Sequence, residues 1–188
     1  LDILDRYNVK ATFFVTNGKP DYQNLIAQEA QRGHTVAIHS ASHDYAKIYQ
    51  SVDAYFADFD EMNSIITAQT GKAADLVRFP GGSSNTISKK YCYGIMSQLV
   101  CAVEERGFRY CDWNVSSGDA GGTTSTSQVV ANVIEEIKSN NVSVVLQHDI
   151  KNFSVDAVEQ IIQWGLSEGY TFLPMTSTTP MSHHGVNN

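Results

Sequence analysis

Residues 33–43 read Gly-His-Thr-Val-Ala-Ile-His-Ser-Ala-Ser-His, and this stretch decides the fold class. A helical pattern over Tyr22–Arg32 ends at Gly33, and a short apolar run over Thr35–Ile38 follows it directly. The same order of helix, glycine and apolar run recurs along the chain. This rhythm predicts an α/β fold in which mainly parallel strands alternate with helices.

Working outward from this stretch, the pattern predicts a series of strands and helices. Apolar runs of strand length lie at Ala11–Val15, Thr35–Ile38, Leu76–Arg78, Arg109–Trp113, Val142–Gln147 and Tyr170–Leu173. Helical patterns lie at Leu1–Tyr7, Tyr22–Arg32, Val52–Thr70, Ser88–Arg106, Ser127–Ser139 and Val155–Glu168. Alternation alone fits an open sheet or a closed barrel, and in both the functional groups gather beyond the carboxyl ends of the strands.

Composition limits the classes of function. The 188 residues carry a formal net charge of −7 at pH 7, which argues against a nucleic-acid partner. Apolar runs stay far below the roughly 20 residues of a membrane-spanning helix, so we expect no membrane span in this chain. A hydrophobic content of 42% suits a single domain, predicted over residues 1–175. Residues 176–188 are rich in Ser, Thr, Asn and Gly and predict a surface tail.

Two histidines follow the strand of the opening stretch. His39 and His43 lie four residues apart, so on a helical turn both imidazoles would face one ion, and zinc would suit them. For an isolated pair at this spacing, an exposed loop without metal is the commoner explanation. Two ligands are also one short of the three that a catalytic zinc site usually takes from the protein.

Two further clusters follow predicted strands. Arg78 to Gly82, Arg-Phe-Pro-Gly-Gly, places a guanidinium before a turn, and turn formation alone would explain the proline and glycines. His148 ends the apolar run at Val142–Gln147, where a general acid or base would be held rigidly, although a lone histidine there is more often structural. Asp119 could orient His148 as its carboxylate partner.

In chain order, four short segments resemble four of the five motifs of the polysaccharide deacetylase (NodB-like, carbohydrate esterase family 4) domain. They are HSASH at 39–43, RFPGG at 78–82, SSGDA at 116–120 and LQH at 146–148. Lys10 to Val15 is similar to the second strand of that family. The resemblance implies a distorted (β/α) barrel with seven or eight strands, whose first strand is expected before Leu1 and missing here.

The resemblance implies roles for the residues of the first two motifs. His39 and His43 would hold a divalent metal, most often zinc. Arg78 would orient the catalytic base. The backbone N–H of Gly81 would help to bind the oxyanion, and Pro80 in the same turn would contact substrate.

The other two motifs would supply the acid and the acetyl pocket. His148 would be the general acid and Asp119 its tuning partner. Leu146 and Trp113 would contact substrate. Ala120 stands where the family usually has a pocket tryptophan, so substrate preference is expected to differ.

The family's first motif, Thr-Phe-Asp-Asp-Gly, supplies the base and the third metal ligand. It should lie before Leu1, and no residue among 1–188 replaces it. This chain is therefore expected to be a fragment, or inactive by itself.

The resemblance implies a hydrolase that removes N-acetyl groups from a polysaccharide, with metal-bound water attacking the acetamide. Residues 78–90 and 112–126 are similar to peptidoglycan deacetylases of Gram-positive bacteria, which favours peptidoglycan as substrate and an extracellular or cell-surface location. Chitin-type oligosaccharides and acetylated xylan are alternatives. Two other classes stay open: a glycan-binding barrel without catalysis, and an unrelated α/β domain that binds an anion at Gly81 to Asn85.

Overall fold

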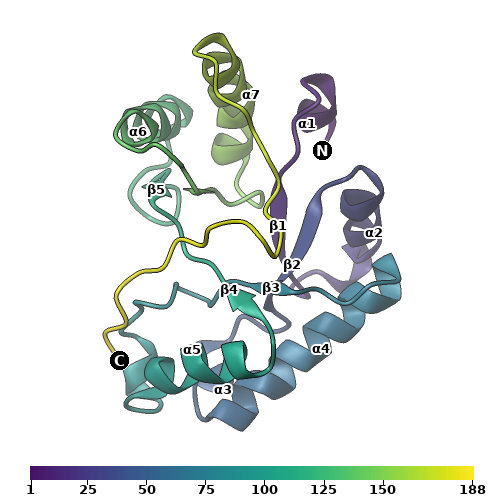
Figure 1. Ribbon diagram of the computed structural model, residues 1–188, viewed down its shortest axis with the longest axis vertical. Coiled ribbons are helices and arrows are strands. Elements are labelled where there is room, and N and C mark those ends of the chain that lie inside the picture. Colours follow the sequence, from purple (N-terminus) through teal and green to yellow (C-terminus); the bar gives the residue numbers. More distant parts are fainter. The chain divides into compact units, whose positions relative to one another are not determined.

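The computed structural model describes residues 1–188, which form two compact units (Figure 1). The larger unit consists of residues 10–112 and 174–188, and the smaller unit of residues 1–9 and 113–173. Each unit has its own parallel sheet and its own apolar core.

A four-stranded parallel sheet forms the centre of the larger unit, with strand order β1-β2-β3-β4. The strands are β1 (Thr12–Thr16), β2 (Thr35–Ser40), β3 (Leu76–Val77) and β4 (Arg109–Tyr110). Parallel neighbours need long crossover connections, and helices supply them here. The helices are α2 (Asn24–Gln31), α3 (Tyr45–Ile48), α4 (Val52–Thr70) and α5 (Ile95–Glu105), with short 3-10 helices at Pro20–Tyr22 and Ser88–Lys90.

Helices α2, α4 and α5 lie along one side of this sheet (Figure 1). Between them and the strands lies a core of fully buried apolar side chains that includes Ile38, Phe59, Met62, Val77 and Leu99. This core fixes the strands whose carboxyl ends carry the predicted histidine pair and Arg78.

Helix α4 forms over the residues that the sequence predicts. Ser51 caps its first turn by accepting a hydrogen bond from the Ala54 N–H, and Gly71 ends it in the left-handed region at φ 76°. Its buried residues repeat at three- and four-residue spacing, as expected for one helical face: Tyr55, Asp58, Phe59, Met62 and Ile66. Asp58 is the charged member of this otherwise mainly apolar face.

The segment predicted as a surface tail is largely exposed and irregular, but it is held to the larger unit. The Asp112 N–H donates to the Ser182 carbonyl at 2.7 Å, and the Ser97 N–H donates to the Asn188 carbonyl at 2.8 Å. The His183 ring stacks on Tyr110 with centroids 3.9 Å apart. Chain termini without such contacts are usually poorly ordered, so these bonds tie this one down.

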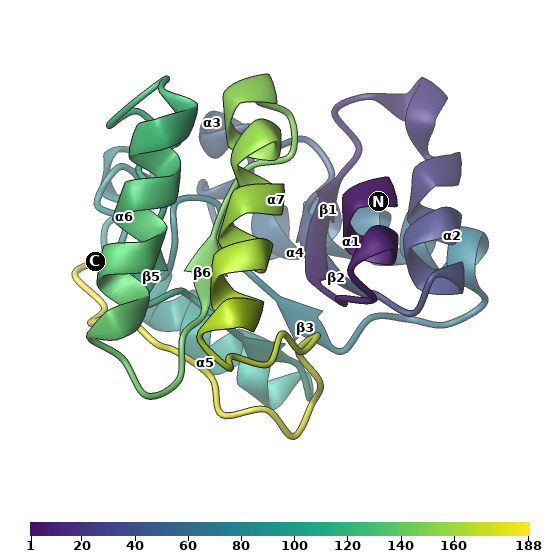
Figure 2. The same cartoon turned by 90° about the horizontal axis from the view of Figure 1, so that it is seen from above.

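The smaller unit pairs two short parallel strands, β5 (Val115–Ser116) and β6 (Val145–Leu146). Helices α6 (Thr126–Lys138) and α7 (Asn152–Ser167) lie side by side (Figure 2). Side chains of these two helices and of β5 form the apolar core of this unit: Val115, Val129, Val133, Ile137, Ala157 and Ile161. Helix α1 (Asp2–Arg6) contacts α7, where Arg6 pairs with Glu159 at 2.5 Å.

The predicted α/β class with parallel strands is confirmed, and six strands form in sheets of four and two. The predicted strand at Tyr170–Leu173 is wrong, because Tyr170 and Phe172 pack on the end of α7 instead. The Phe172 ring lies where a side chain at Gly165 would stand, and the Tyr170 ring packs against Trp164 at 5.4 Å. The predicted helix Ser88–Arg106 is interrupted before α5, at Gly94, whose φ is 75°.

Candidate membrane spans are absent: none of the helices combines the length and the apolar character that crossing a bilayer requires.

Candidate active site

The predicted site residues fall into two sets, one in each unit. The larger unit contains His39, His43, Arg78, Pro80 and Gly81. The smaller unit contains Trp113, Asp119, Leu146 and His148.

The two candidate metal ligands lie together in the larger unit. The ring centroids of His39 and His43 are 5.0 Å apart, with the planes at 49°. His39 Nδ1 lies 2.7 Å from the Arg78 carbonyl oxygen, which can only accept, so Nδ1 carries the proton and Nε2 keeps its lone pair. A ring nitrogen fixed in this way by a backbone carbonyl is the usual support of a metal-binding histidine.

The reason for this proximity differs from the predicted one. Residues 39–43 do not form a helical turn: β2 ends at Ser40, and an irregular loop carries His43. His43 adopts φ 52°, which is uncommon for a residue with a side chain. The loop between the histidines is folded around the buried carboxylate of Asp58, on α4.

These residues fit a divalent metal in part. Two imidazoles side by side, one of them with a defined lone pair, match half of a tetrahedral zinc shell. Groups of three or more His, Cys, Asp or Glu side chains placed to hold a metal are absent. His39 and His43 are therefore two candidate ligands, and no third candidate lies beside them.

Arg78 is held by backbone carbonyls at the end of β3. Its Nε donates to the Cys111 carbonyl and its Nη2 to the Asp112 carbonyl, each at 2.9 Å. The guanidinium lies 4.1 Å above the Phe14 ring, in cation–π geometry. Burial lowers the pKa of Arg78, and the neighbouring Cys111 and Asp112 oppose that shift. The side chain is thus rigidly placed, as an orienting residue must be.

The turn after Arg78 leaves little space beside its backbone. Gly81 has φ 79°, and a Cβ built there would lie 2.6 Å from the Tyr45 hydroxyl oxygen. The Pro80 carbonyl accepts a hydrogen bond from Tyr49 at 2.7 Å. Tyr45 also packs edge-to-face on His43, with centroids 5.7 Å apart. Tyr45 in α3 therefore contacts His43 and lies beside Gly81, and Tyr49 directly after α3 contacts Pro80.

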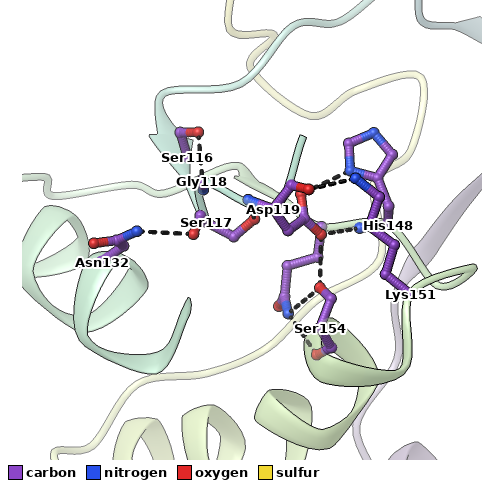
Figure 3. A network of polar contacts seen from close by, with 9 residues as sticks. Ser116, Ser117, Gly118, Asp119, Asn132, His148, Lys151 and Ser154 are labelled. Carbon is purple, nitrogen blue, oxygen red and sulfur yellow. Dashed lines mark hydrogen bonds and ion pairs between the residues drawn. The ribbon is translucent and has the colours of Figure 1, made fainter. Parts of the chain in front are cut away.

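In the smaller unit, the buried carboxylate of Asp119 forms hydrogen bonds with His148, the predicted general acid (Figure 3). The Asp119 side chain is 1% exposed, and that of His148 is 35% exposed. Asp119 Oδ1 accepts from His148 Nδ1 at 2.7 Å, and Oδ2 accepts from the His148 backbone N–H at 2.7 Å and from Ser154 Oγ at 2.6 Å. An ionised carboxylate can only accept, so Nδ1 of His148 carries the proton of this hydrogen bond and Nε2 is the ring nitrogen that Asp119 does not contact.

Contacts on the chain beside Asp119 keep this pair in place (Figure 3). Lys151 Nζ donates to the Asp119 carbonyl, and Asn132 donates to the Ser117 carbonyl at 3.0 Å. Burial raises the pKa of Asp119, but hydrogen bonds from His148 and Ser154 outweigh it and hold that pKa far below its ordinary value. Asp119 is therefore held in its ionised form beside the His148 ring.

The remaining predicted residues of the smaller unit lie on short segments. Leu146 ends β6 and is half-buried, two residues before His148. Trp113 is half-buried, ahead of β5. Ala120 is exposed directly after Asp119, so its small side chain leaves that position open.

Comparison with known proteins decides the family. A family model described as polysaccharide deacetylase matches residues 1–93. The catalytic domain of peptidoglycan N-acetylglucosamine deacetylase from Eubacterium rectale ATCC 33656 is 70% identical, with a TM-score of 0.98, and the match covers 100% of this chain and 86% of that domain. The chain belongs to the polysaccharide deacetylase family.

More distant members of the polysaccharide deacetylase family share the same fold. A polysaccharide deacetylase structure from Bacillus cereus is 29% identical with a TM-score of 0.79, covering 96% of this chain and 87% of that one. A curated peptidoglycan-N-acetylglucosamine deacetylase from the same species is 30% identical over 178 residues, which are 92% of this chain. The chain spans 62% of the length of that relative. The family prediction made from the four motifs is confirmed.

Sequence reasoning missed three residues of this polysaccharide deacetylase site: Asp58, Tyr45 and Ser154. Asp58 carried a signal, since it is an acidic residue on the apolar face of a strongly predicted helix. Tyr45 and Ser154 carried none, because a tyrosine after a loop and a serine in a helical first turn are ordinary.

Proposed function

We propose that this protein is a metal-dependent hydrolase that removes N-acetyl groups from a bacterial cell-wall polysaccharide, with peptidoglycan as the favoured substrate. The observation that carries the proposal is the Asp119–His148 pair: a buried anionic carboxylate that accepts hydrogen bonds from the backbone N–H and the Nδ1–H of a partly exposed histidine. The named activity of the relatives at 70% and 30% identity supports it.

His148 acts as the general acid. Its Nδ1–H is committed to Asp119, so Nε2 holds and transfers the proton that the departing amine needs. The negative charge of Asp119 stabilises the imidazolium before transfer and keeps the ring oriented. Ser154 fixes Asp119 from the other side through its hydroxyl.

His39 and His43 hold the divalent metal, for which zinc is favoured. A divalent metal bound there would supply Lewis-acid chemistry, lowering the pKa of a water and polarising a carbonyl. Arg78 orients the catalytic base, and the Gly81 N–H donates to the oxygen on which negative charge develops. Pro80, Trp113 and Leu146 contact the substrate, and neither the base nor the third metal ligand is assigned to a residue of this chain.

The polymer is the least determined part of the proposal. Peptidoglycan is favoured because the relatives from Eubacterium rectale and Bacillus cereus are named for it, and such a substrate would place the protein at the cell surface. Chitin-type oligosaccharides and acetylated xylan are alternatives, because the small side chain of Ala120 would change one wall of the acetyl pocket that the family resemblance implies.

Acetate release tests the proposal directly. The protein, including any residues that its gene encodes before Leu1, is incubated with peptidoglycan and with N-acetylglucosamine oligomers, loaded with Zn²⁺ or treated with a chelator. Release is expected only from the loaded protein, and His148→Ala should lower it about 100-fold or more. His183→Ala is the matched control, because His183 contacts Tyr110 outside both sets of site residues, and release should continue.

A glycan-binding protein without catalysis is the second candidate. The small, exposed Ala120 directly after Asp119, where the family usually has a tryptophan, favours it. It predicts that the protein binds the same oligomers with no acetate release at any Zn²⁺ concentration, and that His148→Ala changes nothing measurable.

A further inference from the structure

We infer that Asp58 is a positioning residue for the metal site: its buried carboxylate shapes loop 40–43 so that His39 and His43 face each other. The inference rests on the proposed metal-binding function and deepens it. It assigns a role to a residue of α4 that does not itself bind metal.

The geometry of the carboxylate carries the inference. Asp58 Oδ1 accepts from Ser40 Oγ at 2.5 Å and from the Ala41 N–H at 2.8 Å, and Oδ2 accepts from the Ser42 N–H at 2.7 Å. Successive backbone N–H groups that point at one anion form a nest, which fixes the backbone of the residues that donate. The three donors belong to the residues that separate His39 from His43.

A relay extends this hold to His43. The Ser40 hydroxyl donates a hydrogen bond to Asp58, so its lone pairs accept the His43 N–H, at 2.8 Å. That bond holds His43 at φ 52°, a conformation that residues with side chains avoid unless their surroundings impose it. Without Asp58 the Ser40 hydroxyl loses its fixed orientation, and the backbone of His43 can relax and turn its imidazole away from His39.

A purely structural role fits less well. Asp58 is 2% exposed on a face of α4 that otherwise packs apolar side chains, so burying a charge there is costly unless it is fully bonded. Its side-chain hydrogen bonds go to the histidine loop and not to other helices of the core. A helix that served packing alone would place an apolar residue at this position.

Metal affinity is the readout that separates positioning from folding. Asp58→Asn keeps the size of the side chain but replaces one acceptor oxygen with an NH₂ group that faces the Ser42 N–H. Zn²⁺ affinity, measured by calorimetry on the full protein, should fall about 10- to 100-fold, as for other residues that orient metal ligands. The visible absorption of bound Co²⁺ should change as well, because it reports the geometry of the ligands.

Asp60→Asn is the matched control. Asp60 lies on the same helix, loses the same charge and pairs with Arg106 on the surface, where its side chain is 53% exposed. The Zn²⁺ affinity of the Asp60→Asn variant should equal that of the unaltered protein. Ser40→Ala removes the hydroxyl that links Asp58 to the His43 N–H while the Asp58 carboxylate stays. Its Zn²⁺ affinity is expected to fall by less than that of Asp58→Asn. If Asp58→Asn does not fold, as judged by circular dichroism, the Ser40→Ala result decides.

Two results would overturn the inference, and they are distinguishable. If the unaltered protein binds Zn²⁺ in a His43-dependent way and a folded Asp58→Asn variant, or failing that Ser40→Ala, binds it equally well, the positioning role is wrong. If the unaltered protein shows no His43-dependent Zn²⁺ binding, the proposed metal function fails and the inference fails with it.

Discussion

Gly81 shows how tightly the turn beside the histidine loop is built. An alanine there would have to adopt φ 79°, and its Cβ would lie 2.6 Å from Tyr45 Oη and 3.1 Å from Asn85 Cβ. The left-handed backbone alone costs about 1–2 kcal/mol for a residue with a side chain. We expect Gly81→Ala to lower the free energy of unfolding by more than that, measured by urea denaturation.

Gly71→Ala separates the two causes. Gly71 has φ 76°, but nothing lies within 4 Å of a Cβ built there, so this variant reports backbone strain alone. Tyr45→Phe removes the hydroxyl oxygen and should restore part of the extra loss in Gly81→Ala. Equal losses at the two glycines would mean that Tyr45 moves away freely.

Asp119 allows a prediction about catalysis. Asp119→Asn replaces an oxygen that accepts from His148 and weakens control of the imidazole, so kcat for acetate release should fall about 100-fold with a small change in KM. Ser154→Ala removes one hydrogen bond to Asp119 and leaves both hydrogen bonds between Asp119 and His148. Its kcat for acetate release should therefore fall about fivefold. If Ser154→Ala lowered kcat more than Asp119→Asn does, the main role given to Asp119 in orienting His148 would be wrong.

The same carboxylates predict the pH dependence of stability. Burial raises the pKa of both Asp58 and Asp119, but their hydrogen bonds outweigh it, so each folded-state pKa lies below the ordinary 3.8. Such a group stabilises the fold above its unfolded pKa, and the contribution is lost as the pH falls through the folded pKa. The free energy of unfolding should therefore fall below about pH 4, and fall less steeply in Asp119→Asn. Urea midpoints between about pH 3 and pH 6 test this.

At the scale of single elements, helix α4 depends on its cap. Ser51 Oγ accepts the Ala54 N–H at 3.1 Å, so Ser51→Ala should cost about 1 kcal/mol of unfolding free energy. Ser125 caps α6 through a longer bond of 3.4 Å to Gln128, and Ser125→Ala should cost less. Urea denaturation of both variants compares them, and the reverse order would show that the caps do not govern these helix ends.

The elements also show what local sequence can determine. Helix α4 was predicted to the residue because a serine cap, apolar spacing and a left-handed glycine all agree. The strand predicted at Tyr170–Leu173 was wrong because a short apolar run does not by itself determine whether it pairs in a sheet. Whether it pairs in a sheet or packs on α7 depends on Gly165 and Trp164, which are contacts of the folded chain.

At the scale of the whole molecule, motif order predicted the family, which the related structures confirm. The site residues were chosen because parallel strands place the residues that follow them at one end of a sheet, and their roles stay predictions. The cause of the His39–His43 proximity was not predictable in this way. Spacing of four suggested a helical turn, whereas the structure uses a carboxylate from α4, fifteen positions beyond His43, as its anchor. Sequence spacing describes only local geometry, and this contact is tertiary.

Zinc should stabilise the molecule through the larger unit. A ligand that binds only the folded state adds about 2.7 kcal/mol at a free concentration of 100 times its Kd, so Zn²⁺ should raise the thermal midpoint by several degrees. His43→Ala should abolish the rise, because it removes one of the two paired imidazoles. His148→Ala should keep it, since His148 belongs to the smaller unit and is bonded to Asp119. If His43→Ala still gains the full stabilisation, the ion is held elsewhere, and His183→Ala combined with His184→Ala would then test the paired histidines near the C-terminus.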